Sequence, residues 1–166
     1  SYLRDRYDES PEARMGIIAS SRDRALKECG VPNDFMSTKR VTKGPWFTEG
    51  EEDPRSCRHL VDVVTEFGCQ GLELEMPIVA WGTDFFRENG QWTDRKAAGY
   101  RPKGRAKPVN PFQMRINTYR VLLTRGRDGT IVFVPEELAD LDETWEHLLA
   151  CGFRELTIGR SLAAPN

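Results

Sequence analysis

The chain has 166 residues, with 24 Lys and Arg against 26 Asp and Glu, so its formal net charge is −2. This length suits one globular domain and is too short for two domains of ordinary size. The nearly balanced charge excludes a uniformly basic nucleic-acid binder but allows a local basic patch. The longest apolar runs have about five residues, far below the about 20 of a membrane-spanning helix. We therefore expect no membrane contact.

The four cysteines indicate a reducing compartment. None lies in a Cys-x-x-Cys pair, and a disulfide framework in a chain of this size is usually denser. Cys57, His59 and Cys69 have neither the paired spacing of a zinc site nor a clear fourth ligand, so we expect no metal site. The chain begins with Ser1 and shows no secretory leader, so we expect a cytoplasmic segment of a longer polypeptide.

The first 30 residues predict two helical segments around one strand. Residues 2–8 are charged and short, as at the end of a helix, and a Ser-Pro pair follows them. The β-branched apolar run at residues 15–19 predicts a buried strand. Two serines after it predict the start of a helix over residues 20–29, which Gly30 ends.

The next part of the chain predicts a long surface excursion before the second strand. Residues 31–58 contain several Pro and Gly and are expected to be irregular, with Trp46 and Phe47 pinning them to the core. The β-branched content of residues 60–65 predicts a strand, and a Gly-containing turn over residues 66–73 follows it.

The second half of the chain predicts a hairpin, two helices and further strands. An Asn-Gly pair marks the hairpin turn, and a Pro opens the first of these helices. Asp140 is expected to cap the second helix, with Glu143 completing a capping box and a Gly ending it. In chain order the elements are a strand at 78–81, the hairpin at 85–93, a basic loop at 94–110, a helix at 111–124, a strand at 131–134, a helix at 140–150 and a short strand at 155–158.

Short apolar strands therefore alternate with helices along the chain. This pattern predicts an α/β fold with a largely parallel sheet and helices on both faces, plus a small hairpin and long loops. Sheets of this kind bind ligands in the loops beyond the carboxyl ends of their strands. The polar residues next to the predicted strands are therefore candidates for a ligand site.

Residues 65–75 between two predicted strands carry the first unusual chemistry. Turns at Gly68 and Gly71 expose backbone N–H groups to an anion. Glu73 is close enough in sequence to accept hydroxyl hydrogen bonds from a ribose, and the same loop carries polar side chains at Thr65 and Gln70. The alternative is a tight turn in which the glycines serve backbone geometry alone.

Residues 117–129 form the second segment with unusual chemistry. In it, Arg125 and Arg127 follow an apolar helix just before a buried strand. A guanidinium at this position can contact a phosphate through two parallel hydrogen bonds. The alternative is surface charge that the end of the helix dipole favours.

The basic loop has its own two interpretations. Arg101, Lys103 and Arg105 lie close to Trp92 and Tyr100, and aromatic and basic residues together suit single-stranded nucleic acid. A charged loop rich in Gly and Pro is also commonly just solvated surface.

The two unusual segments, in this order and context, resemble motifs V and VI of superfamily 1 helicases. The stretches are VTEFGCQGLELE at residues 64–75 and NTYRVLLTRGRDG at residues 117–129. With GIIASSR at residues 16–22 and DPRS at residues 53–56, they are similar to a bacterial DNA/RNA helicase-like family related to the Schlafen helicase domain. The resemblance covers nearly the whole chain and implies a single RecA-like domain, the second motor domain of such a helicase.

The resemblance implies a role for each matching residue. Arg125 matches the arginine finger that reaches the γ-phosphate of ATP. Glu73 matches the acid that contacts the ribose, and Gly71 matches the glycine beside the phosphates. Thr65 and Gln70 match positions that sense nucleotide and contact single-stranded DNA or RNA. Arg127 matches a position at which the residue type is less uniform among such motors.

Two departures from the family pattern affect this hypothesis. Phe67 occupies a position that is often His in related motors. The chain also contains no GxxxxGK[ST] phosphate loop and no acidic Walker B strand. The resemblance therefore implies that an upstream RecA-like domain of the same polypeptide holds most of the ATP and its Mg²⁺. The rival interpretation is a non-catalytic module that binds nucleic acid or protein.

Overall fold

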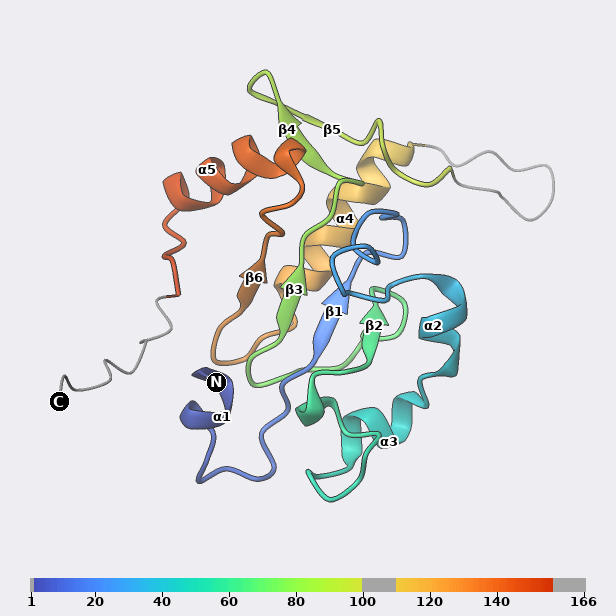
Figure 1. Cartoon of the computed structure of the whole chain (residues 1–166), viewed down its shortest axis with the longest axis vertical. Helices are drawn as coiled ribbons and strands as arrows, with labels where there is room; N and C mark the ends of the chain where they lie inside the picture. The colour runs from blue at the N-terminus through green and yellow to red at the C-terminus, as the bar shows by residue number, and fades with distance from the viewer. Residues whose placement is uncertain (1, 100–109, 157–166) are drawn as a thin grey trace, which may run out of the picture.

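The computed structural model describes residues 2–99 and 110–156. Its centre is a parallel sheet of four strands in the order β2-β1-β3-β6, with a separate antiparallel hairpin (Figure 1). Ile18 pairs with Val64 on one side and Val79 on the other, and Val79 pairs with Val132. The sheet strands are β1 (Ile17–Ala19), β2 (Val63–Thr65), β3 (Ile78–Ala80) and β6 (Ile131–Phe133). All four lie within predicted strands, so the predicted parallel sheet is confirmed.

The two faces of the sheet are covered differently. Helix α4 (Pro111–Leu123) crosses one face and packs Tyr119 and Leu122 against Ile18 and Val79 (Figure 1). The opposite face is covered by α1 (Tyr2–Arg6) and by residues near Leu26. The helices therefore flank the sheet, but one face is covered partly by residues that belong to no helix.

The predicted helix over residues 20–29 is wrong. The Asp23 carboxylate accepts hydrogen bonds from the N–H groups of Ala25 and Leu26, as a helix cap does, but single turns follow. Gly30 then adopts a left-handed φ of 80°, and the N–H of Val31 bonds to the carbonyl of Leu26. The N–H groups of Glu28, Cys29 and Gly30 each bond to the carbonyl three residues earlier, so the segment forms consecutive tight turns that end at Gly30.

The excursion over residues 31–58 is more regular than its composition indicates. It contains α2 (Phe35–Arg40), α3 (Lys43–Thr48) and the 3₁₀ turn η1 (Cys57–His59). Trp46 is completely buried and Phe47 packs partly buried against the same core, which confirms the predicted anchor. A Cβ at Gly16 would lie 2.3 Å from the Trp46 ring, so glycine in front of β1 lets the indole approach the sheet.

The predicted hairpin is confirmed, but the predicted capping box is not. Strands β4 (Phe86–Glu88) and β5 (Gln91–Thr93) are joined by Asn89 and Gly90, both with positive φ. Helix α5 (Asp142–Ala150) follows the turn η2 (Ala139–Leu141), and Leu141 stands at its N-cap without a side-chain hydrogen bond. The Glu143 carboxylate instead accepts hydrogen bonds from the N–H groups of Asn89 and Gly90.

The last predicted strand and the basic loop are described only in part. Glu155 and Leu156 are not in a strand, and residues 157 and 158 lie outside the described residues. Of the basic loop, residues 94–97 form a turn after the hairpin, in which the N–H of Ala97 donates to the carbonyl of Asp94. Arg101, Lys103 and Arg105 lie outside the described residues, so their predicted contact with nucleic acid stays a prediction.

Candidate functional site: the arginine edge of the sheet

The two segments singled out in the sequence lie side by side. Leu74 and Gly126 form a parallel bridge just before β3 and β6. The N–H of Leu74 donates to the carbonyl of Arg125 at 2.9 Å, and the N–H of Arg127 donates to the carbonyl of Leu74 at 2.8 Å. The backbone thus joins residues about 50 positions apart in sequence into one surface. We call residues 70–75 together with residues 125–128 the arginine edge.

The arginine edge lies at the amino ends of the strands, whereas ligand loops were expected beyond the carboxyl ends. Residues 66–73 leave the carboxyl end of β2. The chain must then return to the amino ends of the strands before β3 can run parallel to β2 (Figure 1). Arg125 follows α4, which returns the chain to the same edge before β6. Glu73 and Arg125 therefore meet there, while Thr65 stays at the carboxyl end of β2.

The Arg125 guanidinium is held against backbone carbonyls. Its Nε donates to the carbonyl of Val121 at 2.9 Å, and its Nη1 donates to the carbonyl of Leu72 at 3.2 Å. Its Nη2 lies 3.4 Å from the hydroxyl of Thr124. The side chain is half-buried. These contacts fix the guanidinium directly beside the peptide that joins Leu72 to Glu73.

Three residues of the neighbouring segment 70–73 face solvent. Gln70, Gly71 and Glu73 are exposed. Gly71 has a φ of 82°, and a Cβ there would meet no atom within 4 Å, so its glycine serves the turn and leaves the space above it open. An exposed carboxylate and an open glycine next to Arg125 can accept a ligand that arrives from outside the chain.

Arg127, by contrast, is used within the fold. Its guanidinium forms an ion pair with Glu75 at 3.0 Å and approaches Asp128 at 3.6 Å. The buried Glu75 also accepts the N–H of Arg14 at 2.5 Å. A Cβ at Gly126 would lie 1.9 Å from the carbonyl oxygen of Gly129, so only glycine fits between the two arginines. Arg127 therefore braces the turn that presents Arg125.

Cys69 lies beneath the arginine edge. Its thiol is completely buried, and burial raises its pKa to about 11, with the positive charge of Arg125 acting weakly in the opposite direction. A thiol in this environment stays protonated and packs as a small apolar group.

One comparison with known proteins identifies the family of this chain. The family model of the Schlafen group 3 DNA/RNA helicase domain matches residues 1–136. The chain belongs to this family. The Schlafen group 3 match spans both segments of the arginine edge and ends before α5. Comparison with curated proteins and with solved structures finds no significant match.

Membership in the Schlafen group 3 helicase family makes a nucleic-acid helicase-related function the coarse functional assignment. In residues 2–99 and 110–156 no helix is long and apolar enough to cross a membrane. The same residues contain no cluster of three or more His, Cys, Asp or Glu that could hold a metal ion. All four cysteines are free thiols.

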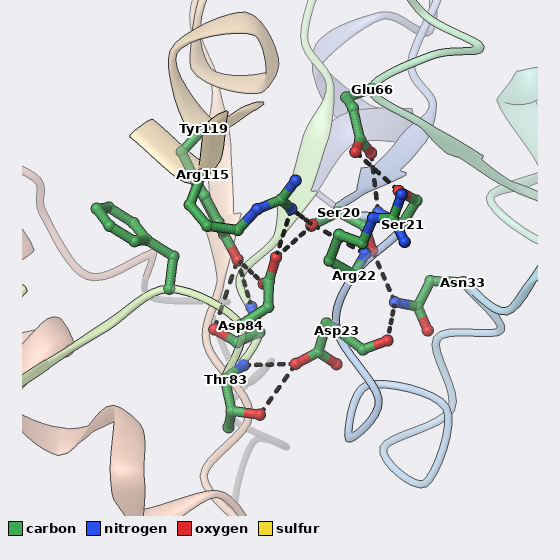
Figure 2. Close-up of polar contacts among 12 residues, drawn as sticks. Ser20, Ser21, Arg22, Asp23, Asn33, Glu66, Thr83, Asp84, Arg115 and Tyr119 are labelled. Carbon is green, nitrogen blue, oxygen red and sulfur yellow. Dashed lines mark hydrogen bonds and ion pairs between the residues drawn. The ribbon is translucent and has the colours of Figure 1, made fainter. Parts of the chain in front are cut away.

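Sequence reasoning missed a buried polar cluster at the opposite, carboxyl edge of this helicase-family sheet. Asp84 is completely buried and accepts hydrogen bonds from Ser20 at 2.5 Å and from the Tyr119 hydroxyl at 2.7 Å (Figure 2). Arg115 forms an ion pair with Asp84 at 3.1 Å and also donates to the Ser20 hydroxyl. We call Ser20, Asp84, Arg115 and Tyr119 the Asp84 cluster.

Burial sets the electrostatics of the Asp84 cluster. It raises the pKa of the Asp84 carboxyl, while the hydrogen bonds from Ser20 and Tyr119 and the charge of Arg115 oppose that shift. Burial also raises the pKa of Tyr119 well above its ordinary value, so the phenol remains a donor. Because Arg115 and Tyr119 come from α4, the cluster fixes the helix that leads to Arg125.

A second contact set connects the same strand ends. The Asp23 carboxylate accepts the N–H of Thr83 at 2.6 Å and its hydroxyl at 3.0 Å (Figure 2). Glu66 accepts both the N–H and the hydroxyl of Ser21 at 2.8 Å. The carboxyl ends of β2, β1 and β3 are therefore joined by carboxylates. The sequence signal for these contacts is faint: each polar residue follows a buried strand closely.

Proposed function

We propose that this chain is the second, RecA-like motor domain of a superfamily 1-type, ATP-dependent DNA/RNA helicase or translocase. The observation that carries the proposal is the direct pairing of the two segments, in which Leu74 bonds to Arg125 and Arg127. Family membership supplies the helicase context. Strands of DNA or RNA are the proposed substrate track, and the cytoplasm is the proposed location.

In this proposal the arginine edge completes an ATP site that another domain begins. Apart from Arg127 and its ion-pair partners Glu75 and Asp128, the edge offers one guanidinium, one exposed carboxylate and an open glycine, but no cradle of N–H groups around a triphosphate. This donor set fits a partial contact with ATP. The upstream RecA-like domain of the same polypeptide therefore holds most of the ATP and Mg²⁺, which supplies charge neutralisation during phosphoryl transfer.

Each residue of the edge has a proposed role. Arg125 stabilises the charge that develops on the transferring phosphoryl group. Glu73 accepts hydrogen bonds from the ribose hydroxyls, Gly71 lets the phosphates approach, and Gln70 senses nucleotide. Arg127 contributes chiefly by holding the turn, since its charge already pairs with Glu75.

The geometry of Arg125 also indicates how its action is controlled. Its three nitrogens are occupied by the carbonyls of Val121 and Leu72 and by the hydroxyl of Thr124. Closure of the two motor domains on ATP is expected to exchange the Leu72 carbonyl for phosphate oxygens, which bind a guanidinium more strongly because they are charged. Turnover then requires domain closure.

A second candidate is a non-catalytic module that binds nucleic acid or protein. The absence of a phosphate loop from the sequence and the Phe at position 67 are the observations that favour it. Both candidates predict that the 166-residue chain alone hydrolyses no ATP above background. Turnover by the chain alone that depends on Arg125 would contradict both.

ATP turnover by the intact protein distinguishes the two candidates, and Glu73→Gln in that protein tests the ribose contact. A ribose contact is made equally in the ground state and the transition state, so the KM for ATP should rise about tenfold while kcat changes little. That factor corresponds to about 1.4 kcal/mol, close to the lower end of the range for a hydrogen bond to a charged group. Glu52→Gln changes another exposed carboxylate and should leave the KM unchanged. Equal KM values for both variants would contradict the ribose contact, whereas an intact wild-type protein without ATP turnover would favour the binding module.

A further inference from the structure

The N-terminal segment of the chain, residues 2–16, lies against the arginine edge. Helix α1 lies at the amino ends of the sheet strands, next to the loops that precede β3 and β6 (Figure 1). The buried Leu3 and Tyr7 pack with Met15 and Met76 in one hydrophobic cluster. Met76 follows the arginine edge directly in sequence, so this cluster fixes the N-terminal segment next to that edge.

Backbone hydrogen bonds join the segment to both halves of the arginine edge. The N–H groups of Glu75 and Met76 donate to the carbonyl of Arg14 at 2.9 Å and 3.4 Å. The N–H of Asp128 donates to the carbonyl of Glu75 at 2.9 Å. Arg14, Glu75 and Asp128 therefore lie on three adjacent stretches of chain, with Glu75 in the middle.

Two carboxylates divide their oxygens between the N-terminal segment and Arg127. Asp128 accepts a hydrogen bond from the Tyr7 hydroxyl at Oδ2, at 2.8 Å, and its Oδ1 lies 3.6 Å from Nε of Arg127. Glu75 accepts the N–H of Arg14 at Oε2, at 2.5 Å, and its Oε1 lies 3.0 Å from Nη2 of Arg127. Arg127 thus holds both carboxylates, and each carboxylate in turn holds the N-terminal segment.

The Tyr7 hydroxyl is a donor that the fold encloses. The residue is only 7% exposed. Burial raises the pKa of Tyr7, and the hydrogen bond to Asp128 acts in the same direction, so the phenol keeps its proton. The Asp128 side chain is partly open to solvent. The bond from the enclosed Tyr7 therefore selects one orientation of the more open Asp128 carboxylate.

Polar contacts hold the turn that follows Arg125. No residue from 126 to 130 is buried, and none carries a large apolar side chain that could anchor the turn in the core. The turn is tight, because a Cβ at Gly126 would lie 1.9 Å from the carbonyl oxygen of Gly129. A tight turn moves as one unit, so a shift of Asp128 displaces Arg125 as well.

We propose that Tyr7 is a positioning residue for Arg125, acting through its hydrogen bond to Asp128. The inference rests on the proposed function, in which Arg125 acts on ATP and an upstream motor domain belongs to the same polypeptide. Residues 2–16 then connect the two motor domains. The bond from Tyr7 to Asp128 ties this connection to the turn that carries Arg125, so movement of the upstream domain is transmitted to the guanidinium.

Tyr7→Phe in the intact protein tests the inference, since it removes the donor and keeps the ring that packs with Leu3 and Met76. Loss of one hydrogen bond to a charged group should lower the population of the ordered turn, and with it kcat, about tenfold. The KM for ATP should change little, because the proposed ribose contact of Glu73 is untouched. Asp128→Ala removes the same bond from the exposed partner and decides the question if Tyr7→Phe fails to fold.

Tyr2→Phe is the matched control for this variant. Tyr2 lies on the same helix, and its hydroxyl accepts a hydrogen bond from Arg6 at 3.5 Å on the exposed side, so its loss should leave kcat unchanged. In an isotope-labelled chain, the NMR resonance of the Arg125 Nε–H should move in Tyr7→Phe and stay in place in Tyr2→Phe.

A double variant separates positioning of Arg125 from a purely structural role of Tyr7. Arg125→Ala has no guanidinium left to position, so the addition of Tyr7→Phe should lower kcat no further. A structural defect caused by Tyr7→Phe would lower kcat by the same factor in both backgrounds.

Three results would overturn the inference, and they are distinguishable. If Arg125→Ala lowers kcat while Tyr7→Phe matches its Tyr2→Phe control, Tyr7 does not position the finger and the proposed function stands. If Tyr7→Phe lowers kcat equally with and without Arg125, the hydroxyl acts through another group, and the proposed function again stands. If Arg125→Ala leaves kcat unchanged, the proposed role of the finger fails and the inference fails with it.

Discussion

Asp84 shows how much a single buried charge contributes at the residue scale. It is fully buried, and its partner Arg115 is almost fully buried on α4. A guanidinium cannot lose its proton in a protein, so removal of the Asp84 charge leaves Arg115 uncompensated. Asp84→Asn should therefore lower the free energy of unfolding by about 3 to 5 kcal/mol, as measured by urea denaturation.

The exposed ion pair between Glu88 and Arg95 is the matched control for this prediction. Its closest N–O distance of 2.5 Å is shorter than the 3.1 Å of the buried pair. Both of its side chains face solvent, so Glu88→Gln should change the free energy of unfolding by about 1 kcal/mol or less. Equal losses in the two variants would show that burial does not determine the strength of these pairs.

Sequence reasoning selected some candidate residues and missed a buried polar cluster for a physical reason. Arg125 and Glu73 were selected because a glycine-rich turn and an arginine next to predicted strands are visible as local patterns. Asp84 and Arg115 were missed because the burial of a polar residue depends on partners distant in sequence. The sequence predicts that Phe35 lies in an irregular excursion. In the structure Phe35 begins α2, and the position of this helix beside β2 places the ring in the lining of a groove.

At the scale of elements, Glu143 connects α5 to the hairpin. Its carboxylate accepts the N–H groups of Gly90 and Asn89, and these bonds lower its pKa from 4.5. A lowered pKa in the folded state means that the charged form stabilises this contact above pH 4.5. The stabilisation is lost as the pH falls through the lower folded-state pKa.

NMR titration of the Gly90 amide measures this contact. Its chemical shift should follow a midpoint below 4.5 in wild type, and Glu143→Gln should abolish that titration. Glu146→Gln, on the same helix but exposed, should preserve it. A Gly90 amide that titrates identically in both variants would show that another carboxyl group causes the shift.

The strands were predictable at this scale, and some of the helices were not. Runs of β-branched residues marked all four strands of the sheet because a strand buried on both faces is apolar at every position. The helix over residues 20–29 failed because Asp23 and Gly30 impose turns that outweigh helical propensity. Glu143 matched a capping box in sequence, but the hairpin turn supplied better donors for its carboxylate.

At the scale of the whole molecule, α4 runs from the carboxyl ends of the sheet strands to their amino ends. Its buried residues Arg115 and Tyr119 hold the Asp84 cluster at the carboxyl edge, and its end delivers Arg125 to the amino edge. Thr65, the proposed nucleic-acid contact, and the proposed nucleotide-facing arginine edge therefore lie at opposite ends of the same short strands. This arrangement allows one rigid domain to contact a strand and a nucleotide at the same time.

The turnover of Arg125→Ala in the intact protein tests the central claim most directly. An arginine finger acts on charge that develops in the transition state, so kcat should fall much more than ATP affinity. Fingers of this kind contribute ~10³ to 10⁵ in rate, which is about 4 to 7 kcal/mol. Arg125→Lys keeps the charge but not the planar fork, so it should recover only a small part of that rate. Nucleic-acid-stimulated turnover of Arg125→Ala within a few-fold of wild type would contradict the assignment of Arg125, and an intact wild type without any such turnover would favour the non-catalytic module.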